Sequence, residues 1–176
     1  MPKTMLVIAL YGLALLGPMS PALAKDETVS HTYEGGITLT LTTRPFDPKA
    51  HKVTMCGETV CAIDDMPVYG TYGRMPKEEV VSLVLERNGK KTPLDVTNMY
   101  NPNVNNSNIK RYLKVYYFGD DAYQVSGYFS HDDGDDSMYI CLWSIMGEAS
   151  IRNHLSDYES LSILTTEVRK DFGLEP

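Results

Sequence analysis

Apolar and polar side chains alternate along several short stretches of this chain. In "GITLTLTT", residues 36–43, Ile37, Leu39 and Leu41 alternate with threonines. A side-chain period of two suits a half-buried β-strand and not a helix. The same alternation recurs, with turn residues between the segments, in residues 111–119, 122–130 and 137–145. These three segments predict a meander of consecutive antiparallel strands.

Residues 78–96 are compatible at first sight with either a helix or a hairpin. Pro76 followed by Lys-Glu-Glu resembles a helix start, whereas Asn88-Gly89 is a strong two-residue hairpin turn. With that turn, one face becomes apolar and Pro93 falls opposite Val84, a site where its missing N–H does no harm. We therefore expect a hairpin with the pairs Arg87–Lys90, Leu85–Thr92, Leu83–Leu94 and Val81–Val96.

A helix is predicted at the C-terminus. Ser156 and Glu159 have the spacing of a capping box, with Ser156 as the N-cap. One apolar stripe then follows at helical spacing, and we expect it to dock on a sheet: Leu161, Leu164, Val168 and Phe172. The expected fold is mainly β: an antiparallel sandwich or open barrel of seven to eight strands with one C-terminal helix.

The first 24 residues have the pattern of a cleaved signal peptide. Lys3 precedes an apolar run from Met5 to Leu16, and Ala22-Leu23-Ala24 fits a cleavage site. The run is too short to span a bilayer. We expect a mature chain of residues 25–176, folded as a single β-rich domain and located in the periplasm.

The mature chain is acidic. Fifteen lysines and arginines stand against 23 aspartates and glutamates, a net charge of −8. Such a chain repels nucleic acid and anionic lipid and attracts cationic surfaces. No further apolar stretch is long enough for an anchor, so neither a nucleic-acid partner nor stable membrane insertion is expected.

Three cysteines follow the cleavage site. Cys56 and Cys61 enclose a four-residue turn in "CGETVC", and an exported protein favours a disulfide there. Zinc is a weaker alternative, because no histidine pair lies nearby. Cys141 lies in "MYICLW" and is expected to be a buried small hydrophobe.

Catalytic motifs are absent from the sequence. The four histidines are scattered, no serine lies in G-x-S-x-G, and no glycine-rich loop leads from a strand into a helix. We therefore expect no enzyme activity, no cofactor and no dedicated metal site.

An acidic turn separates two of the alternating segments. It has four aspartates around Gly134: Asp132, Asp133, Asp135 and Asp136. The EF-hand spacing fails, because position twelve counted from Asp132 is Trp143. A solvated turn, a looser calcium site on the four aspartates, an acid–base pair and a recognition knob remain open. The knob would use the aspartates with Tyr128 and Tyr139 to contact a basic cleft of a partner protein.

Two stretches resemble a known group of proteins. They are residues 61–102, which contain "PVYGT" and a hairpin leading to "MY", and residues 127–161, which contain the acidic turn and "W-x-I". Both are similar to small exported proteobacterial proteins, some of which look like periplasmic immunity proteins against effectors of the type VI secretion system. The resemblance implies a protein that binds and blocks a toxic effector. We expect a phospholipase or a peptidoglycan hydrolase as the target, since both substrates are accessible from the periplasm.

Two other functions stay open from the sequence alone. A small-ligand binding protein of the envelope would require an apolar pocket between the sheets. A secreted hydrolase would require a compact pocket with a serine or a carboxylate beside one histidine.

Overall fold

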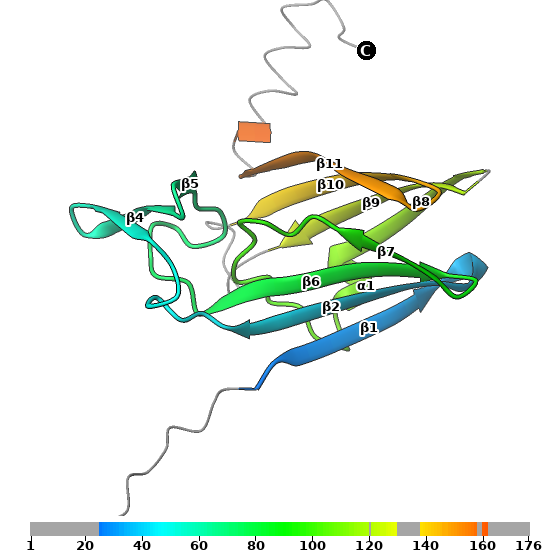
Figure 1. The fold of residues 1–176 in the computed structure, drawn as a ribbon, viewed down its shortest axis with the longest axis horizontal. Helices are drawn as coiled ribbons and strands as arrows, with labels where there is room; N and C mark the ends of the chain where they lie inside the picture. Colours follow the sequence, from blue (N-terminus) through cyan, green and yellow to red (C-terminus); the bar gives the residue numbers. More distant parts are fainter. Residues whose placement is uncertain (1–24, 120, 130–137, 158–159, 162–176) are drawn as a thin grey trace, which may run out of the picture.

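Eleven strands in three antiparallel sheets make up most of the described chain (Figure 1). The structure, a computed structural model, describes residues 25–119, 121–129, 138–157 and 160–161. The mainly β expectation is confirmed. The number of strands in this part of the chain exceeds the expected seven to eight, and the sheets do not close into a barrel.

The first four-stranded sheet has the strand order β1-β2-β6-β7. A short 3-10 turn, η1 (Glu34–Gly36), joins β1 to β2. The threonines of β2 face outward while Ile37, Leu39 and Leu41 are buried, as the alternation predicts. The bounds are β1 Glu27–Tyr33, β2 Ile37–Pro45, β6 Glu78–Arg87 and β7 Lys90–Leu94.

The second four-stranded sheet has the order β11-β10-β9-β8, so its strands form an antiparallel meander. The expected meander of three strands is confirmed, and residues 149–157 add a fourth. A single-turn helix, α1 (Ile109–Tyr112), leads into the first of these strands and buries Ile109. The bounds are β8 Leu113–Gly119, β9 Ala122–Phe129, β10 Tyr139–Met146 and β11 Ala149–Asp157.

A small sheet lies at one end of the molecule, on the left of Figure 1. It consists of β3 (Val53–Cys56), β4 (Thr59–Ile63) and β5 (Met66–Pro67). Cys56 and Cys61 are bonded across the β3–β4 turn with their Cα atoms 5.8 Å apart, so the predicted pairing agrees with the structure. The small sheet packs around a separate hydrophobic cluster of Val60, Ile63 and Tyr100.

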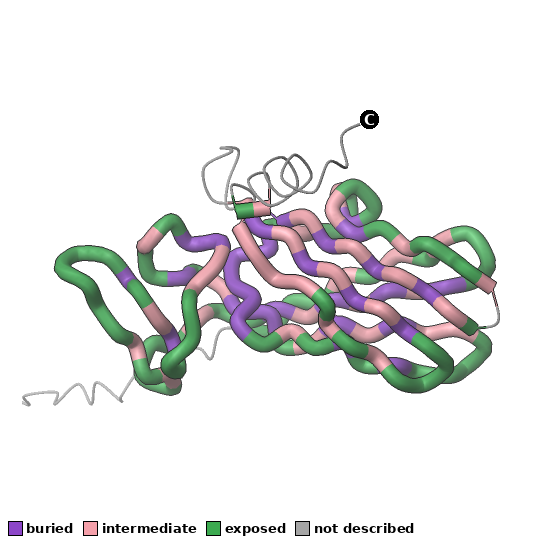
Figure 2. The backbone as a smooth tube through the Cα atoms, turned by 90° about the horizontal axis from the view of Figure 1, so that it is seen from above, coloured by how far each residue is buried: buried purple, intermediate pink, exposed green. Residues whose placement is uncertain are grey.

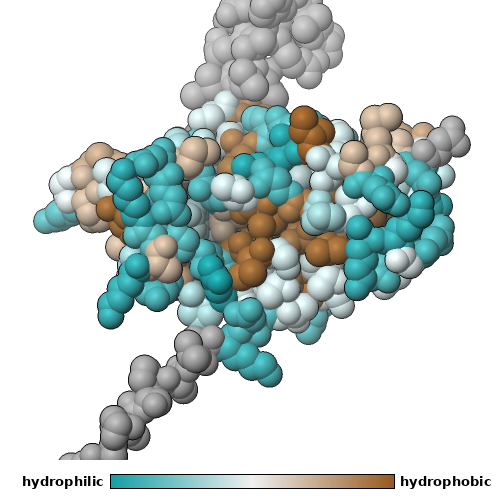
Figure 3. Space-filling model, viewed as in Figure 1, coloured by the Kyte–Doolittle hydropathy of each residue, from teal (hydrophilic) through white to brown (hydrophobic). Residues whose placement is uncertain are grey.

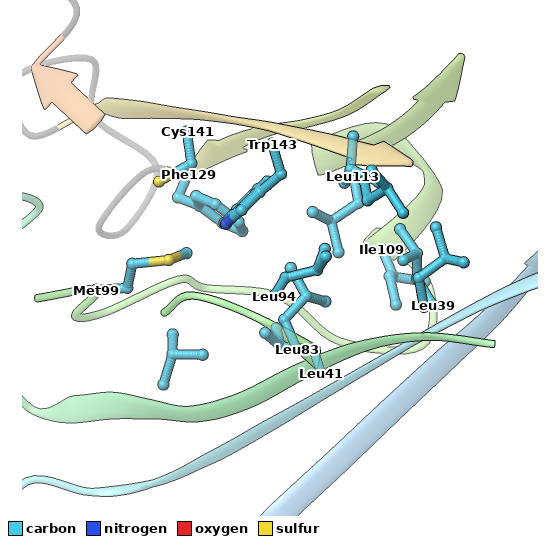
Figure 4. Close-up of a cluster of buried hydrophobic side chains, with 14 of the residues drawn as sticks. Leu39, Leu41, Leu83, Leu94, Met99, Ile109, Leu113, Phe129, Cys141 and Trp143 are labelled. Atoms are coloured by element: carbon cyan, nitrogen blue, oxygen red, sulfur yellow. The ribbon is translucent and has the colours of Figure 1, made fainter. Parts of the chain in front are cut away.

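One hydrophobic core joins the two larger sheets. Along their strands buried residues alternate with half-buried ones (Figure 2). Leucines of the first sheet pack toward Phe129, Cys141 and Trp143 of the second, and Met99 and Ile109 fill the space at the sides (Figure 4). Cys141 is fully buried and free, as expected.

The hairpin register is confirmed over its paired length. Arg87 pairs with Lys90, Leu85 with Thr92 and Leu83 with Leu94, and Pro93 lies opposite Val84. The expected inward position of Val81 is wrong: Val81 is 39% exposed and Val80 is buried instead. Thr42 pairs with Ser82 and Thr43 with Val80, so Val81 is the extra residue of a bulge in β6. Such a bulge reverses the alternation of the strand on its other side, and Val80 takes the inward position.

The expected N-cap of the C-terminal helix is also wrong. Ser156 belongs to β11, which continues through Asp157. Ser160 and Leu161 are helical, and the Asp157 carboxylate accepts hydrogen bonds from the backbone N–H and the hydroxyl of Ser160. Asp157 therefore makes the capping contact. The partner residue Glu159 and the stripe beyond Leu161 lie outside the described residues.

In the described part of the chain, no helix has both the length and the apolar character needed to cross a bilayer.

Candidate functional site: an aromatic groove at the end of the sheets

A groove of about 750 Å³ opens at the end of the two larger sheets that lies opposite the small sheet. We call it the end groove. The β1–β2 connection, the end of β6 and the edge strand β8 form its walls. The lining residues are Tyr33, Glu34, Gly35, Ile37, Arg87, Val115, Tyr116, Tyr117 and Phe118.

Arg87 is held rigidly in the groove wall. Its guanidinium lies 5.2 Å from the ring centre of Tyr117 and 5.4 Å from that of Tyr123. Its Nη1 donates to Asp121 Oδ1 at 2.9 Å and to the hydroxyl of Tyr123. The rings of Tyr117 and Tyr123 and the carboxylate of Asp121 therefore hold the guanidinium in one orientation.

The other walls combine a half-buried tyrosine, Tyr33, with exposed aromatic rings. The hydroxyl of Tyr33 donates to the backbone oxygen of Leu113 at 2.8 Å, which ties β1 to β8. Burial raises the pKa of Tyr33 to about 12, so its hydroxyl stays protonated as a donor. In contrast, Tyr117 is 57% exposed and Phe118 is 70% exposed.

A histidine between two carboxylates lies near the small sheet. His51 Nδ1 donates to Asp64 Oδ2 at 2.7 Å, and Nε2 lies 3.1 Å from Glu79 Oε2. The imidazole stacks on Phe46, and Arg44 pairs with the same Glu79. The hydrogen bond from His51 and one from the backbone of Lys52 lower the pKa of Asp64. This network links the β2–β3 connection, the β4–β5 turn and β6, beside a pocket of about 290 Å³.

A second histidine contacts a serine. His154 Nε2 lies 2.7 Å from Ser156 Oγ, and both side chains are half-buried on the edge strand β11. His154 also lines a pocket of about 260 Å³ with Arg152 and Tyr69. The serine hydroxyl also donates to the backbone oxygen of Asp157. Among the described residues no carboxylate contacts His154, so the pair lacks the orienting acid of a hydrolase triad.

The acidic turn, with its four aspartates, falls within residues 130–137, which lie outside the described residues. The flanking positions are described. Tyr139 is fully buried and packs against Phe129 at 5.1 Å between ring centres, which leaves no side-chain surface for a partner. Tyr128 is half-buried, and its hydroxyl donates to the sulfur of Met138. The role of the aspartates and of Tyr128 stays a prediction.

The strand directions separate the residues that flank the acidic turn from the end groove. β9 begins at Ala122, beside Gly119 of β8 and therefore at the groove end, and finishes at Phe129. Tyr139, where β10 begins, pairs with Phe129. Phe129 and Tyr139, which flank the acidic turn in the sequence, therefore lie at the end of the sheet opposite the groove.

No group of three or more histidines, cysteines, aspartates or glutamates is arranged to hold a metal ion within the described ranges. The loose calcium site, which would use the four aspartates, falls outside those ranges and stays untested.

Charge is distributed unevenly along the chain. The described residues carry 13 lysines and arginines against 14 acids, a net charge of −1. Residues 25–176 have a net charge of −8, so a charge of −7 belongs to residues 120, 130–137, 158–159 and 162–176. On the face drawn in Figure 3, hydrophobic residues gather over the middle, whereas the β6–β7 hairpin tip is hydrophilic.

The sequence contains one signal for the end groove. Tyr116, Tyr117 and Phe118 are three consecutive aromatic residues in an alternating strand, so they cannot all face the core. All three are at least half exposed. The approach of Arg87 to Tyr117 and Tyr123 has no sequence signature, because it depends on the packing of β6 against the second sheet.

The chain matches no protein-family model, no curated protein and no solved structure, so no function is transferred to it from a relative.

Proposed function

We propose that this chain is an exported inhibitor of the immunity type, which binds a toxic effector in the periplasm and blocks it. The effector class is a phospholipase or a peptidoglycan hydrolase, since both substrates are accessible from that compartment. In this proposal the two larger sheets form a sandwich-type scaffold, and the end groove is the surface that contacts the effector.

The observation that carries the proposal is the pairing of a fixed arginine with exposed aromatic rings in the end groove. Tyrosine and arginine are enriched among the residues that dominate binding energy at protein interfaces. Arg87 is already oriented by Tyr117 and Tyr123, so little side-chain entropy is lost when a partner binds. Tyr117 is more than half exposed and can be covered by a partner.

The uneven charge supports a second element of the same proposal. The acidic turn carries four aspartates, whereas the described part of the chain is nearly neutral. A local acidic segment attracts a basic effector surface and raises the association rate. The acidic turn and the end groove have no residue in common, so the two elements can be tested separately.

The test begins with capture. The tagged chain is exported to the periplasm, and the proteins retained from periplasmic extract are identified by mass spectrometry. Each candidate is then purified, and its affinity is measured for the wild type, Tyr117→Ala and Ile151→Ala. Ile151 is a matched control, because it is 64% exposed on β11 and lies outside the end groove.

We expect Tyr117→Ala to weaken effector binding by about 2 kcal/mol, the size typical of an interface hot spot, and Ile151→Ala to leave it unchanged. Equal affinity of all three proteins would remove the end groove from the proposal. A captured protein that is harmless in the periplasm would remove the immunity function.

Small-ligand binding in the envelope is a second candidate, favoured by the volume of the end groove. About 750 Å³ lies within the range of small-molecule sites, and aromatic walls with one cation suit an anionic aromatic ligand. Thermal-shift screening of such ligands distinguishes the two candidates, because a ligand that binds only the native protein raises its melting temperature.

A hydrolase is a third candidate, and one observation favours it: the contact between His154 and Ser156 beside a small pocket. A hydrolytic role requires that His154 accept the proton of Ser156 during attack on a carbonyl. Ester hydrolysis that disappears in Ser156→Ala, with folding intact, would support this role over inhibition.

A further inference from the structure

A basic and aromatic surface lies on α1 and β8. It consists of Lys110, Arg111, Lys114, Tyr116 and Phe118, and we call it the basic–aromatic strip. All five residues are exposed. Lys114 and Tyr116 alternate along β8 and so share one face of this strand. Phe118 follows at the point where the register with β9 shifts, between Tyr117 and Gly119. β8 is the edge strand of its sheet, which leaves the strip open along one side.

The three cations of the strip have no acidic partners in the described chain. Lys114 Nζ donates to the backbone oxygen of Lys110 at 2.9 Å, which brings this ammonium close to α1. Arg111 lies over the ring of Tyr112 at 5.5 Å. Among the described residues no carboxylate lies within ion-pair distance of any of the three cations. Three positive charges on nine residues of chain are therefore available to an anionic surface.

The aromatic residues of the strip are unusually exposed for their size. Tyr116 is 50% exposed and Phe118 is 70% exposed. Tyrosine has an apolar ring and a polar tip, which suits the boundary between lipid headgroups and acyl chains. Phenylalanine at the edge of a surface can enter that boundary without unfolding the strand beneath it.

We propose that the basic–aromatic strip docks this chain on the surface of an anionic phospholipid bilayer. The cations contact the lipid phosphates, and the rings of Tyr116 and Phe118 enter the headgroup region. The unpaired backbone groups of the edge strand remain in the hydrated layer, so docking is peripheral. The proposal does not rest on the effector-binding function: Tyr116 and Phe118 also line the end groove, but the three cations of the strip lie outside it.

The composition of the strip favours lipid over a protein partner. Lysine is depleted at protein interfaces, whereas lysine and arginine place their charged ends in the headgroup layer while their stems lie along apolar surface. The strip combines two lysines and an arginine with aromatic rings, which is the composition of interfacial anchors.

The net charge of the whole chain does not prevent this docking. A charge of −7 belongs to segments outside the described residues, whereas the described part has a net charge of only −1. At physiological salt, charges separated by more than about 8 Å are largely screened from one another. The approach of the strip to lipid therefore depends on the charges within about 8 Å of its cations more than on the total charge.

The experiment is flotation of the full mature chain with phosphatidylcholine vesicles, with and without phosphatidylglycerol. We expect the wild type to float only with the anionic vesicles. Lys110→Gln together with Lys114→Gln removes two charges, each of which contributes about a fivefold increase in partition, and should weaken partition by about 25-fold. Lys90→Gln with Lys91→Gln is the matched control, because both lysines are exposed on the β6–β7 hairpin and neither belongs to the strip.

A second measurement tests the aromatic residues. Phe118→Trp places a tryptophan on the strip, and its emission should shift to shorter wavelength when anionic vesicles are added. Trp143 is fully buried, so its own emission stays constant and provides the internal reference. Circular dichroism confirms that each variant is folded.

Three outcomes would overturn the proposal. They are failure of the wild type to float with anionic vesicles, equal loss of partition in the strip and hairpin variants, and an unchanged Phe118→Trp emission. Retention on immobilised polyglutamate without vesicle binding would assign the strip to an acidic protein partner and would overturn it as well.

Discussion

The indole nitrogen of Trp143 donates a hydrogen bond to the backbone oxygen of Asp95 at 2.8 Å. Trp143 lies on β10 of the second sheet, and Asp95 follows β7 of the first. Arg152 of β11 binds the same connection through Asp95 Oδ2 and the backbone oxygen of Thr97. These contacts fix one side of the scaffold that carries the end groove.

Trp143→Phe should therefore lower the free energy of unfolding by about 1–3 kcal/mol, because the Asp95 oxygen loses its donor. Trp143→Ala should cost about 3–5 kcal/mol, because it also opens a cavity in the shared core. Urea unfolding followed by circular dichroism measures both. A Trp143→Ala protein as stable as the wild type would contradict the packing of the two sheets around this residue.

Gly127 provides space for two rings of the core. A methyl group added there would lie 2.7 Å from Cζ of Phe129 and 3.2 Å from Cζ3 of Trp143, and both rings are fully buried. Gly127→Ala should destabilise the protein by about 1–3 kcal/mol through overpacking. Ser126→Ala, on the half-buried opposite face of β9, is the control and should cost less than 1 kcal/mol by the usual size of such surface changes. Equal stabilities of the two variants would disprove the close packing.

The hydrogen bond between His51 and Asp64 predicts acid sensitivity. The pKa of Asp64 in the folded protein lies below its ordinary value of 3.8. The ionised form therefore stabilises the fold above that pH, and this contribution is lost as the pH falls through the lower, folded-state pKa. Below about pH 4, Asp64→Asn should lose stability less steeply than the wild type. Urea unfolding at a series of pH values tests this, with Glu58→Gln of the β3–β4 turn as the control.

The cysteines should differ in reactivity. Burial raises the pKa of the Cys141 thiol to about 12, so we expect no reaction with thiol reagents in the native protein. Cys56 and Cys61 should appear as one linked peptide in mapping without reduction. Replacing both with serine should cost about 2 kcal/mol, from the entropy of a short closed loop. A disulfide through Cys141 would contradict both the Cys56–Cys61 pairing in the β3–β4 hairpin and the burial of Cys141.

Strand alternation and turn chemistry could be read from the sequence because they are local. The Asn88-Gly89 turn fixed the register of β6 and β7 as expected. The same alternation places Tyr139 on the buried face that carries Cys141 and Trp143, so the sequence pattern itself predicts that Tyr139 is buried. The bulge that exposes Val81 was not readable, because it depends on the pairing of β6 with β2.

The end groove shows the limit of local patterns. Three consecutive aromatic residues indicate an exposed surface. The position of Arg87 beside Tyr117 and Tyr123, however, depends on contact between two sheets whose strands are far apart in the sequence. Likewise, the sequence predicts Ser156 as a helix N-cap, because a serine three residues before a glutamate, here Glu159, is a common capping pattern. The pairing of β11 with β10 kept it in the strand instead.

The central claim is that the end groove blocks an effector, and cell growth tests it most directly. Cells exporting the captured effector are supplied with the wild type, with Tyr117→Ala combined with Arg87→Lys, or with the control Ile151→Ala. Lysine keeps the charge of Arg87 but cannot reproduce its planar stacking. We predict growth with the wild type and the control, and arrest with the groove variant present at equal, folded levels. Full protection by the folded groove variant would contradict the claim.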